Sequence, residues 1–172
     1  MCILSFQKKE RFYASLFLLL FLSFNSQADI WYDLGYEYSQ QGKHQKAFNM
    51  MQKSASIGNP AAQNNLGLSY LYGLGVDKNK YKAFVWFKKA AKQGLADAQN
   101  ELGLFYYDMK KVKKAYDWWI KSAKQNNEYA EFNLGSFFLE QNNKTKAKFW
   151  FEKSLKHKHP KAKQALDYVI RN

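Results

Sequence analysis

The sequence predicts an all-α protein: a right-handed α-solenoid of about four helix-turn-helix repeats, closed by a C-terminal capping helix. A Leu-Gly pair returns after 32, 36 and 32 residues, and a Lys-Ala pair returns in step with it. No stretch alternates apolar and polar residues as a half-buried strand would. Self-similarity with a period of about 20 to 50 residues is typical of solenoids, in which each repeat buries its apolar face against its neighbours. The signature residues are Leu34, Gly35, Leu66, Gly67, Leu102, Gly103, Leu134 and Gly135, with Ala47, Ala83, Ala115 and Ala147 from the Lys-Ala pairs.

Each repeat opens with a helix whose apolar stripe is centred on the Leu. In the third repeat Ala98 precedes Leu102 by four residues and Tyr106 follows it by four, so all three lie on one helical face. The adjacent Gly103 costs helix propensity, about 1 kcal/mol against Ala. Because this glycine returns in all four repeats, we expect a second helix to pack there too closely to admit a side chain.

The second helix of each repeat begins near the Lys-Ala pair and carries large residues three and four positions later, as in Trp118-Trp119. Gly58 and Gly94 are suited to left-handed helix ends, and Asn59-Pro60 to the start of the next helix. The predicted helices are 30–41 and 43–57, 61–72 and 79–93, 97–109 and 111–125, 129–141 and 143–157, with the cap from about 161. The corresponding repeats are 29–60, 61–96, 97–128 and 129–160, and the cap is 161–172.

The first 28 residues have the features of an export signal. A basic start is followed by the apolar run 12–24 and by the small-x-small site Ser26-Gln27-Ala28. Thirteen helical residues span roughly 20 Å, less than the ~30 Å of a hydrocarbon core. We therefore expect cleavage near Ala28, a periplasmic or secreted mature chain, and no stable membrane insertion after cleavage. A retained signal that acts as an anchor is the alternative.

Composition limits the partners. The chain carries a net charge of +13, of which residues 105–172 supply +8, and its only cysteine, Cys2, lies in the predicted signal. Such a field attracts acidic proteins, anionic lipid or nucleic acid. Export argues against nucleic acid, so the expected partner is another protein, an acidic one. A solvated lysine coat without a steering role also fits this charge.

The second repeat carries the most specific resemblance. The runs 62–70 (AQNNLGLSY), 73–76 (GLGV) and 82–94 (KAFVWFKKAAKQG) resemble a complete Sel-one-like repeat, a relative of the tetratricopeptide repeat. The other three repeats resemble the same unit with the Gly-x-Gly-Val turn deleted. This resemblance implies a non-enzymatic adaptor of the bacterial cell envelope that binds a partner on its concave helical surface.

Two other functions occur among similar proteins. Some small exported relatives are immunity proteins that neutralise a secreted antibacterial lipase-type toxin. Cysteine-rich relatives have been credited with β-lactamase activity, but their paired cysteines are missing from this chain.

The candidate binding residues lie opposite the core stripe of the first helices, at positions rotated by about 140 to 200° from the Leu. A purely solvated face would carry fewer apolar and aromatic side chains than this one. The predicted partner contacts on the concave face are Tyr32, Tyr36, Asn64, Asn100, Tyr107 and Phe132. For the leucines on the same face, such as Leu68 and Leu104, packing on the neighbouring repeat is the alternative.

The sequence predicts no catalytic residue, no metal site and no cofactor. It has no nucleophile elbow, no His-Glu-x-x-His and no phosphate-binding glycine loop. Gly73 and Gly75 are interpreted as turn residues. His157 and His159 flank Lys158 and have the spacing to share a metal, but we expect a solvated helix end with no adjoining carboxylate cluster.

Overall fold

The computed structural model describes residues 26–171, and all regular structure within them is helical. The prediction of an all-α repeat protein is confirmed. The chain divides into two compact units, one ending at Asn79 and one beginning at Lys80, and each is described by itself.

The first unit holds a helix over residues 26–40, then α2 (His44–Ser56) and α3 (Pro60–Tyr72). The start of α3 is the predicted one: Asn59 accepts a hydrogen bond from the backbone N–H of Ala62 at 2.9 Å, and Pro60 follows as the first helical residue. Gly73, with φ of 77°, ends α3 and opens the turn 73–79.

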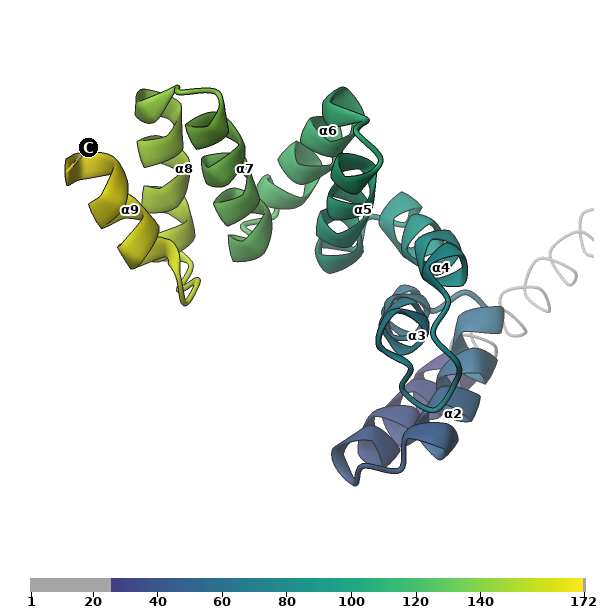
Figure 1. Ribbon diagram of the computed structural model, residues 1–172. Helices are drawn as coiled ribbons and strands as arrows, with labels where there is room; N and C mark the ends of the chain where they lie inside the picture. Colours follow the sequence, from purple (N-terminus) through teal and green to yellow (C-terminus); the bar gives the residue numbers. More distant parts are fainter. Residues whose placement is uncertain (1–25, 172) are drawn as a thin grey trace, which may run out of the picture. The chain divides into compact units, whose positions relative to one another are not determined.

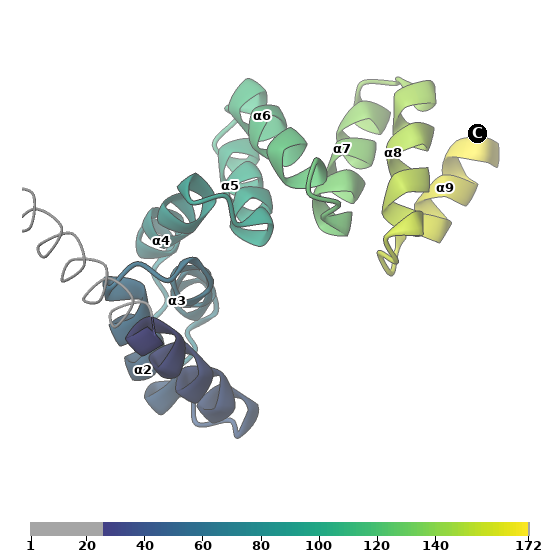
Figure 2. The same ribbon diagram turned by 180° about the vertical axis from the view of Figure 1, so that it is seen from behind.

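The second unit is a row of helices in which each packs on the next (Figure 1). Seen from behind, α5 to α9 keep the same order (Figure 2). Every helix from α2 to α9 begins and ends within two residues of its predicted bounds. The helices of this unit are α4 (Lys80–Lys92), α5 (Ala96–Asp108), α6 (Val112–Ala123), α7 (Glu128–Glu140), α8 (Lys144–Lys156) and α9 (Ala162–Arg171).

The repeated glycines lie where helices of one repeat meet most closely. A Cβ at Gly103 would collide with the indole of Trp119, and one at Gly135 would lie 2.5 Å from the Phe151 ring. Leu102, next to Gly103, is completely buried. The glycine signature therefore reflects helix contact, as the sequence predicts.

A serine in three repeats ties the end of the second helix to the start of the first. The Ser122 hydroxyl donates to the carbonyl of Ala96 at 2.7 Å, and Ser154 donates to Glu128 at 2.8 Å. In the first repeat Ser54 donates to Ala28 at 2.7 Å, and the Ala28 side chain is buried. Each bond gives a buried serine hydroxyl an acceptor on the neighbouring helix.

The repeated lysines lie over aromatic rings. Lys114 of the Lys-Ala pair has its Nζ 5.7 Å from the centroid of Tyr106, and Lys121 has its Nζ 4.2 Å from Trp118. Such cation–π contacts contribute about 0.5–1 kcal/mol each at exposed sites. The same pairs recur as Lys46–Tyr38, Lys146–Phe138, Lys89–Trp86 and Lys153–Trp150. Part of the positive charge thus has a structural role within each repeat.

Most of the predicted export signal, residues 1–25, lies outside the described residues, and residues 26–28 are helical. Among the helices that the structure describes, none combines the length and the apolar character needed to cross a bilayer.

Candidate functional site

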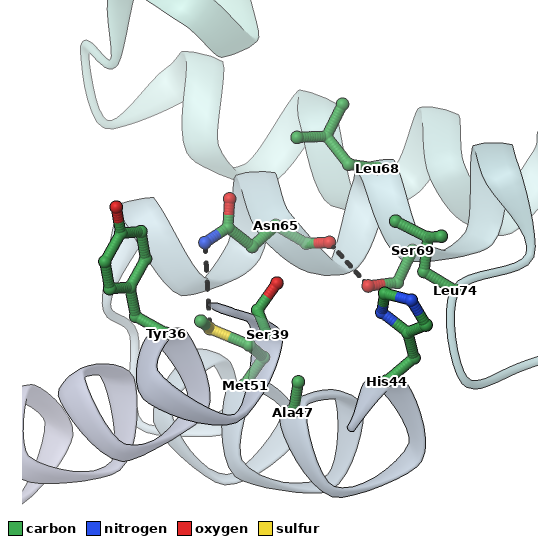
Figure 3. A pocket seen from close by; sticks show the side chains of 9 residues that line it. All are labelled: Tyr36, Ser39, His44, Ala47, Met51, Asn65, Leu68, Ser69 and Leu74. Atoms are coloured by element: carbon green, nitrogen blue, oxygen red, sulfur yellow. Dashed lines mark hydrogen bonds between the residues drawn. The ribbon is translucent and has the colours of Figure 1, made fainter. Parts of the chain in front are cut away.

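A pocket of about 170 Å³ lies in the first unit, where the helix over residues 26–40 faces α2 and α3 (Figure 3). Its walls come from all three helices and from the turn after α3. The lining residues are Tyr36, Ser39, His44, Ala47, Met51, Asn65, Leu68, Ser69 and Leu74.

The pocket has an apolar floor and a mixed rim. Ala47 and Met51 of α2 are buried beneath it, whereas Tyr36 is 52% exposed and Leu74 is 38% exposed. Figure 3 shows Tyr36 and His44 at opposite ends of the lining. For comparison, an apolar cavity of about 150 Å³ holds a benzene molecule. The pocket is therefore large enough for one apolar side chain of a partner.

Two substitutions within the repeat pattern leave this space open. Met51 occupies the position at which later repeats carry Phe87, Trp119 and Phe151. Ser69 occupies the position of Phe105 in the third repeat. Because an unbranched thioether and a hydroxymethyl group fill less volume than aromatic rings, the first unit retains a hollow here.

The four extra residues of the second repeat help to build one wall. Gly75 has φ of 72°, and a Cβ there would collide with the carbonyl of His44 and lie 2.7 Å from the backbone N of Gln45. Only glycine allows the turn to approach the start of α2 this closely. Leu74, the residue before Gly75, lines the pocket. The turn therefore forms part of the pocket wall as well as connecting two helices.

Asn65 supplies a polar group with a weak internal partner. Its Nδ2 donates to the Met51 sulfur at 3.8 Å, and its backbone carbonyl accepts a bond from the Ser69 hydroxyl at 2.8 Å (Figure 3). A thioether is a weak acceptor, so the Asn65 amide can exchange it for a carbonyl of a bound chain at little cost. An apolar floor with a few polar groups at the rim is the usual character of a binding site for a side chain.

The structure separates the predicted contact residues into different environments. Tyr36 lines the pocket together with Ser39 and Leu68 from the same predicted face, and Tyr32 is half-buried. The expected exposure of the two amides is wrong, because Asn64 is only 8% exposed and Asn100 only 5%.

Asn100 is covered because the next repeat packs over it. Its Oδ1 accepts a bond from Asn133 Nδ2 at 2.8 Å, and its Nδ2 lies 3.5 Å from Glu101 Oε1. Burial raises the pKa of the Glu101 carboxyl, and the bond from Asn100 opposes that shift. Contact of either buried amide with a partner stays a prediction.

The two aromatic candidates of the second unit already have internal partners. The Tyr107 hydroxyl donates to the Glu140 carboxylate, and this bond raises the pKa of the phenol. The Phe132 ring stacks on His159 with centroids 4.2 Å apart. Burial lowers the pKa of the His159 imidazole. The Tyr107 bond joins the third repeat to the fourth, whereas the Phe132 stacking lies within the fourth repeat.

His157 and His159 do not face a common site. His157 Nδ1 lies 2.7 Å from Oε2 of Glu131, whose other oxygen is 3.6 Å from Lys153 Nζ. The carboxylate beside His157 belongs to the fully buried Glu131 and is a single group, not a cluster. The expected solvation of this helix end is wrong for His159, which is only 7% exposed. Within residues 26–171 no group of three or more His, Cys, Asp or Glu side chains has a geometry that could hold a metal ion.

Comparison with known families agrees with this architecture. The Sel1 repeat model matches residues 60–95 and 96–127, and a tetratricopeptide repeat model matches residues 28–57 and 132–156. The chain is a Sel1-type repeat protein. The predicted resemblance is confirmed, and the two full Sel1 matches include the repeat with the Gly-x-Gly-Val turn.

Solved structures show the same fold. A Sel1 repeat protein from Oxalobacter formigenes is 34% identical with a TM-score of 0.69, over 77% of this chain and 58% of that one. The protective antigen c5321 of uropathogenic Escherichia coli is 26% identical with a TM-score of 0.79, over 84% of this chain and 34% of that one. Pseudomonas aeruginosa pilF is 21% identical with a TM-score of 0.68, over 87% and 70%. Our Sel1-type chain thus spans less than two thirds of the first protein and about a third of the second. A search of curated proteins found no match.

Proposed function

We propose that this Sel1-type protein is a non-enzymatic interaction module of the bacterial cell envelope, which binds another protein through the first-helix face of its first unit. The observation that carries the proposal is the pocket between Tyr36, Leu68 and Leu74, with its buried Met51 floor. Sel1 and tetratricopeptide repeats are typically protein–protein interaction modules.

The pocket is suited to an apolar side chain with a polar backbone beside it. A buried apolar floor rewards insertion of an apolar side chain by about 25 cal/mol per Å² of surface removed from water. Asn65 at the rim can bond the backbone of the inserted segment, and the exposed Tyr36 ring can cover it. Aromatic residues of this kind commonly supply a large share of the binding energy at interfaces.

The proposed location rests on the signal-like residues 1–28, and the proposed acidic partner rests on the net charge of +13. Lysines that lie outside the pocket would accelerate encounter with an acidic protein, an effect that decreases with salt. An immunity protein that occludes a secreted lipase toxin would use the same kind of surface, and the identity of the captured partner separates that role from an adaptor role.

The test is affinity capture from envelope extracts with the wild-type chain and two single variants, quantified by mass spectrometry. Tyr36→Ala removes the exposed ring at the pocket. Tyr168→Ala is the matched control, because Tyr168 is similarly exposed, at 57%, on α9. We expect proteins that are retained by wild type and Tyr168→Ala but lost with Tyr36→Ala. Equal recovery with all three proteins would refute the pocket as the binding site.

A further inference from the structure

The second unit has two aromatic hollows at equivalent positions of successive repeats. We call them notch 1, between α4 and α5, and notch 2, between α6 and α7. Notch 1 has a volume of about 320 Å³ and is lined by Lys80, Tyr81, Phe84, Phe105, Asp108 and Met109. Notch 2 has a volume of about 400 Å³ and is lined by Val112, Lys113, Tyr116, Phe137, Phe138 and Lys146.

A shift of 32 residues maps one notch on the other. Phe84 and Phe105 of notch 1, with centroids 5.9 Å apart, correspond to Tyr116 and Phe137 of notch 2, with centroids 5.7 Å apart. The next shift places Lys148 at the position of the first ring, so the ring pair ends with notch 2. The notches are thus a feature of two adjacent repeats.

The two notches also adjoin each other. Met109 lies at the edge of notch 1, and Val112 lies at the edge of notch 2. Val112 follows Met109 by three positions in the α5–α6 turn, so their Cα atoms are at most about 11 Å apart. Both are exposed, at 45% and 41%, and Tyr81 at the outer end is 77% exposed. Large apolar groups of this exposure, placed in sequence along one strip, mark an interaction surface.

The charge of the notch linings indicates what kind of partner would bind there. The notch linings carry the exposed Lys80, Lys113 and Lys146 against the single carboxylate of Asp108. Because each chain has a net charge of +13, a second copy would be repelled from this strip. An acidic partner would be attracted to it.

We propose that notches 1 and 2 together bind an extended acidic segment of a partner protein, with one apolar side chain in each notch. Successive repeats contribute two helix layers of about 10 Å each, so the notch centres are roughly 20 Å apart. An extended chain covers about 3.3 Å per residue, so the two apolar anchors are separated by roughly six residues. This site is independent of the pocket in the first unit.

The test uses fluorescein-labelled synthetic peptides in a Glu/Ser background and fluorescence anisotropy with the full chain. One peptide has two Leu anchors six residues apart, a second has one anchor replaced by Ser, and a third has every Glu replaced by Lys. We expect the two-anchor acidic peptide to bind roughly tenfold more tightly than either of the others, which corresponds to about 1.4 kcal/mol.

Exposed positions supply variants that leave the fold intact. Tyr81→Ser and Lys113→Glu should each weaken the two-anchor peptide at least threefold. Tyr168→Ser and Lys163→Glu on α9, exposed but outside the notches, and Tyr36→Ala at the pocket, should leave its affinity unchanged. Equal affinities for the three peptides, or equal effects of notch and control variants, would overturn the proposal without affecting the proposed function of the pocket.

Discussion

Replacement of the repeated glycines by alanine should have opposite consequences in different repeats. At Gly103 an added Cβ would collide with the Trp119 indole, which is 2% exposed and held between Tyr107 and Phe137 at centroid distances of 5.4 and 6.3 Å. At Gly35 the contacts are longer: the terminal methyl of Met51 lies at 3.1 Å, and Met51 Cγ and Met50 Cβ lie at 3.2 Å. A fixed ring cannot move away, whereas the end of a flexible thioether can.

Two opposing contributions determine whether each alanine variant is more or less stable than the wild type. Overpacking a well-filled contact costs about 1–3 kcal/mol. Alanine recovers about 1 kcal/mol of helix propensity relative to glycine. Gly103→Ala should therefore lose about 1 kcal/mol net, and Gly35→Ala should be neutral or gain up to about 1 kcal/mol. A bulkier Gly103→Leu should lose a few kcal/mol, because the whole side chain must find space in the same contact.

Thermal unfolding followed by circular dichroism measures the difference. For a domain of 150–250 residues each kcal/mol corresponds to about 2–4 °C, so a difference of about 1–2 kcal/mol between the two alanine variants corresponds to roughly 2–8 °C. Gly135→Ala should behave like Gly103→Ala, because its Cβ would meet the buried Phe151 ring. Equal melting temperatures for Gly35→Ala and Gly103→Ala would show that the helix contact at Gly103 is not as close as described.

Three further outcomes are expected. Ser122→Ala should lower the free energy of unfolding by about 1 kcal/mol through loss of its buried bond to a carbonyl, and the exposed Ser56→Ala should not. Burial lowers the pKa of His159, so below pH ~6.5 the imidazole binds a proton more readily in the unfolded chain than in the folded one. The urea concentration at the unfolding midpoint should therefore fall as the pH drops from about 6.5. The fall should be smaller in His159→Gln than in His44→Gln, a control at an exposed histidine. Glu131→Gln should be tolerated within about 1 kcal/mol in urea unfolding, whereas Glu131→Ala should be distinctly less stable.

We expect Glu131→Gln to be tolerated because two other repeats carry glutamine at the equivalent position. Gln63 and Gln99 occupy the same position and donate from Nε2 to the carbonyls of Ala55 and Ala91 at 3.3 Å. A glutamine at 131 can make the corresponding bond in place of the contacts with His157. A large loss of stability in Glu131→Gln would show that the buried carboxylate itself is required.

The fold could be predicted from the sequence because each repeat carries the same packing residues in the same order. Leu102 follows Ala83 by 19 residues, the same spacing separates this Ala and Leu at every junction between repeats, and that register determines which faces of two helices meet. Helix bounds followed from Asn59-Pro60 and from the left-handed positions at Gly58 and Gly94. Even the ending of the fourth repeat is regular, since Lys158 adopts φ of 70° where glycine stands elsewhere.

The site was harder to predict because periodicity describes a helix within its own repeat. Asn100 lies opposite the core stripe, yet the following repeat covers it through Asn133. The pocket depends on departures from the pattern, namely Met51 and Ser69 in positions that are aromatic in later repeats. Those departures can be read from the sequence, but only a structure shows that no other side chain fills the volume they vacate.

The bond from Ser54 to the carbonyl of Ala28 connects cleavage of the predicted signal with the stability of the first repeat. A peptidase that cuts after Ala28 removes both the acceptor and a buried methyl group from the first helix. The hydroxyl of Ser54 must then bond water or the new terminus, so the processed chain would have a looser first repeat than its precursor. Cleavage at that position would therefore loosen the helix that carries Tyr36 and Ser39 of the pocket.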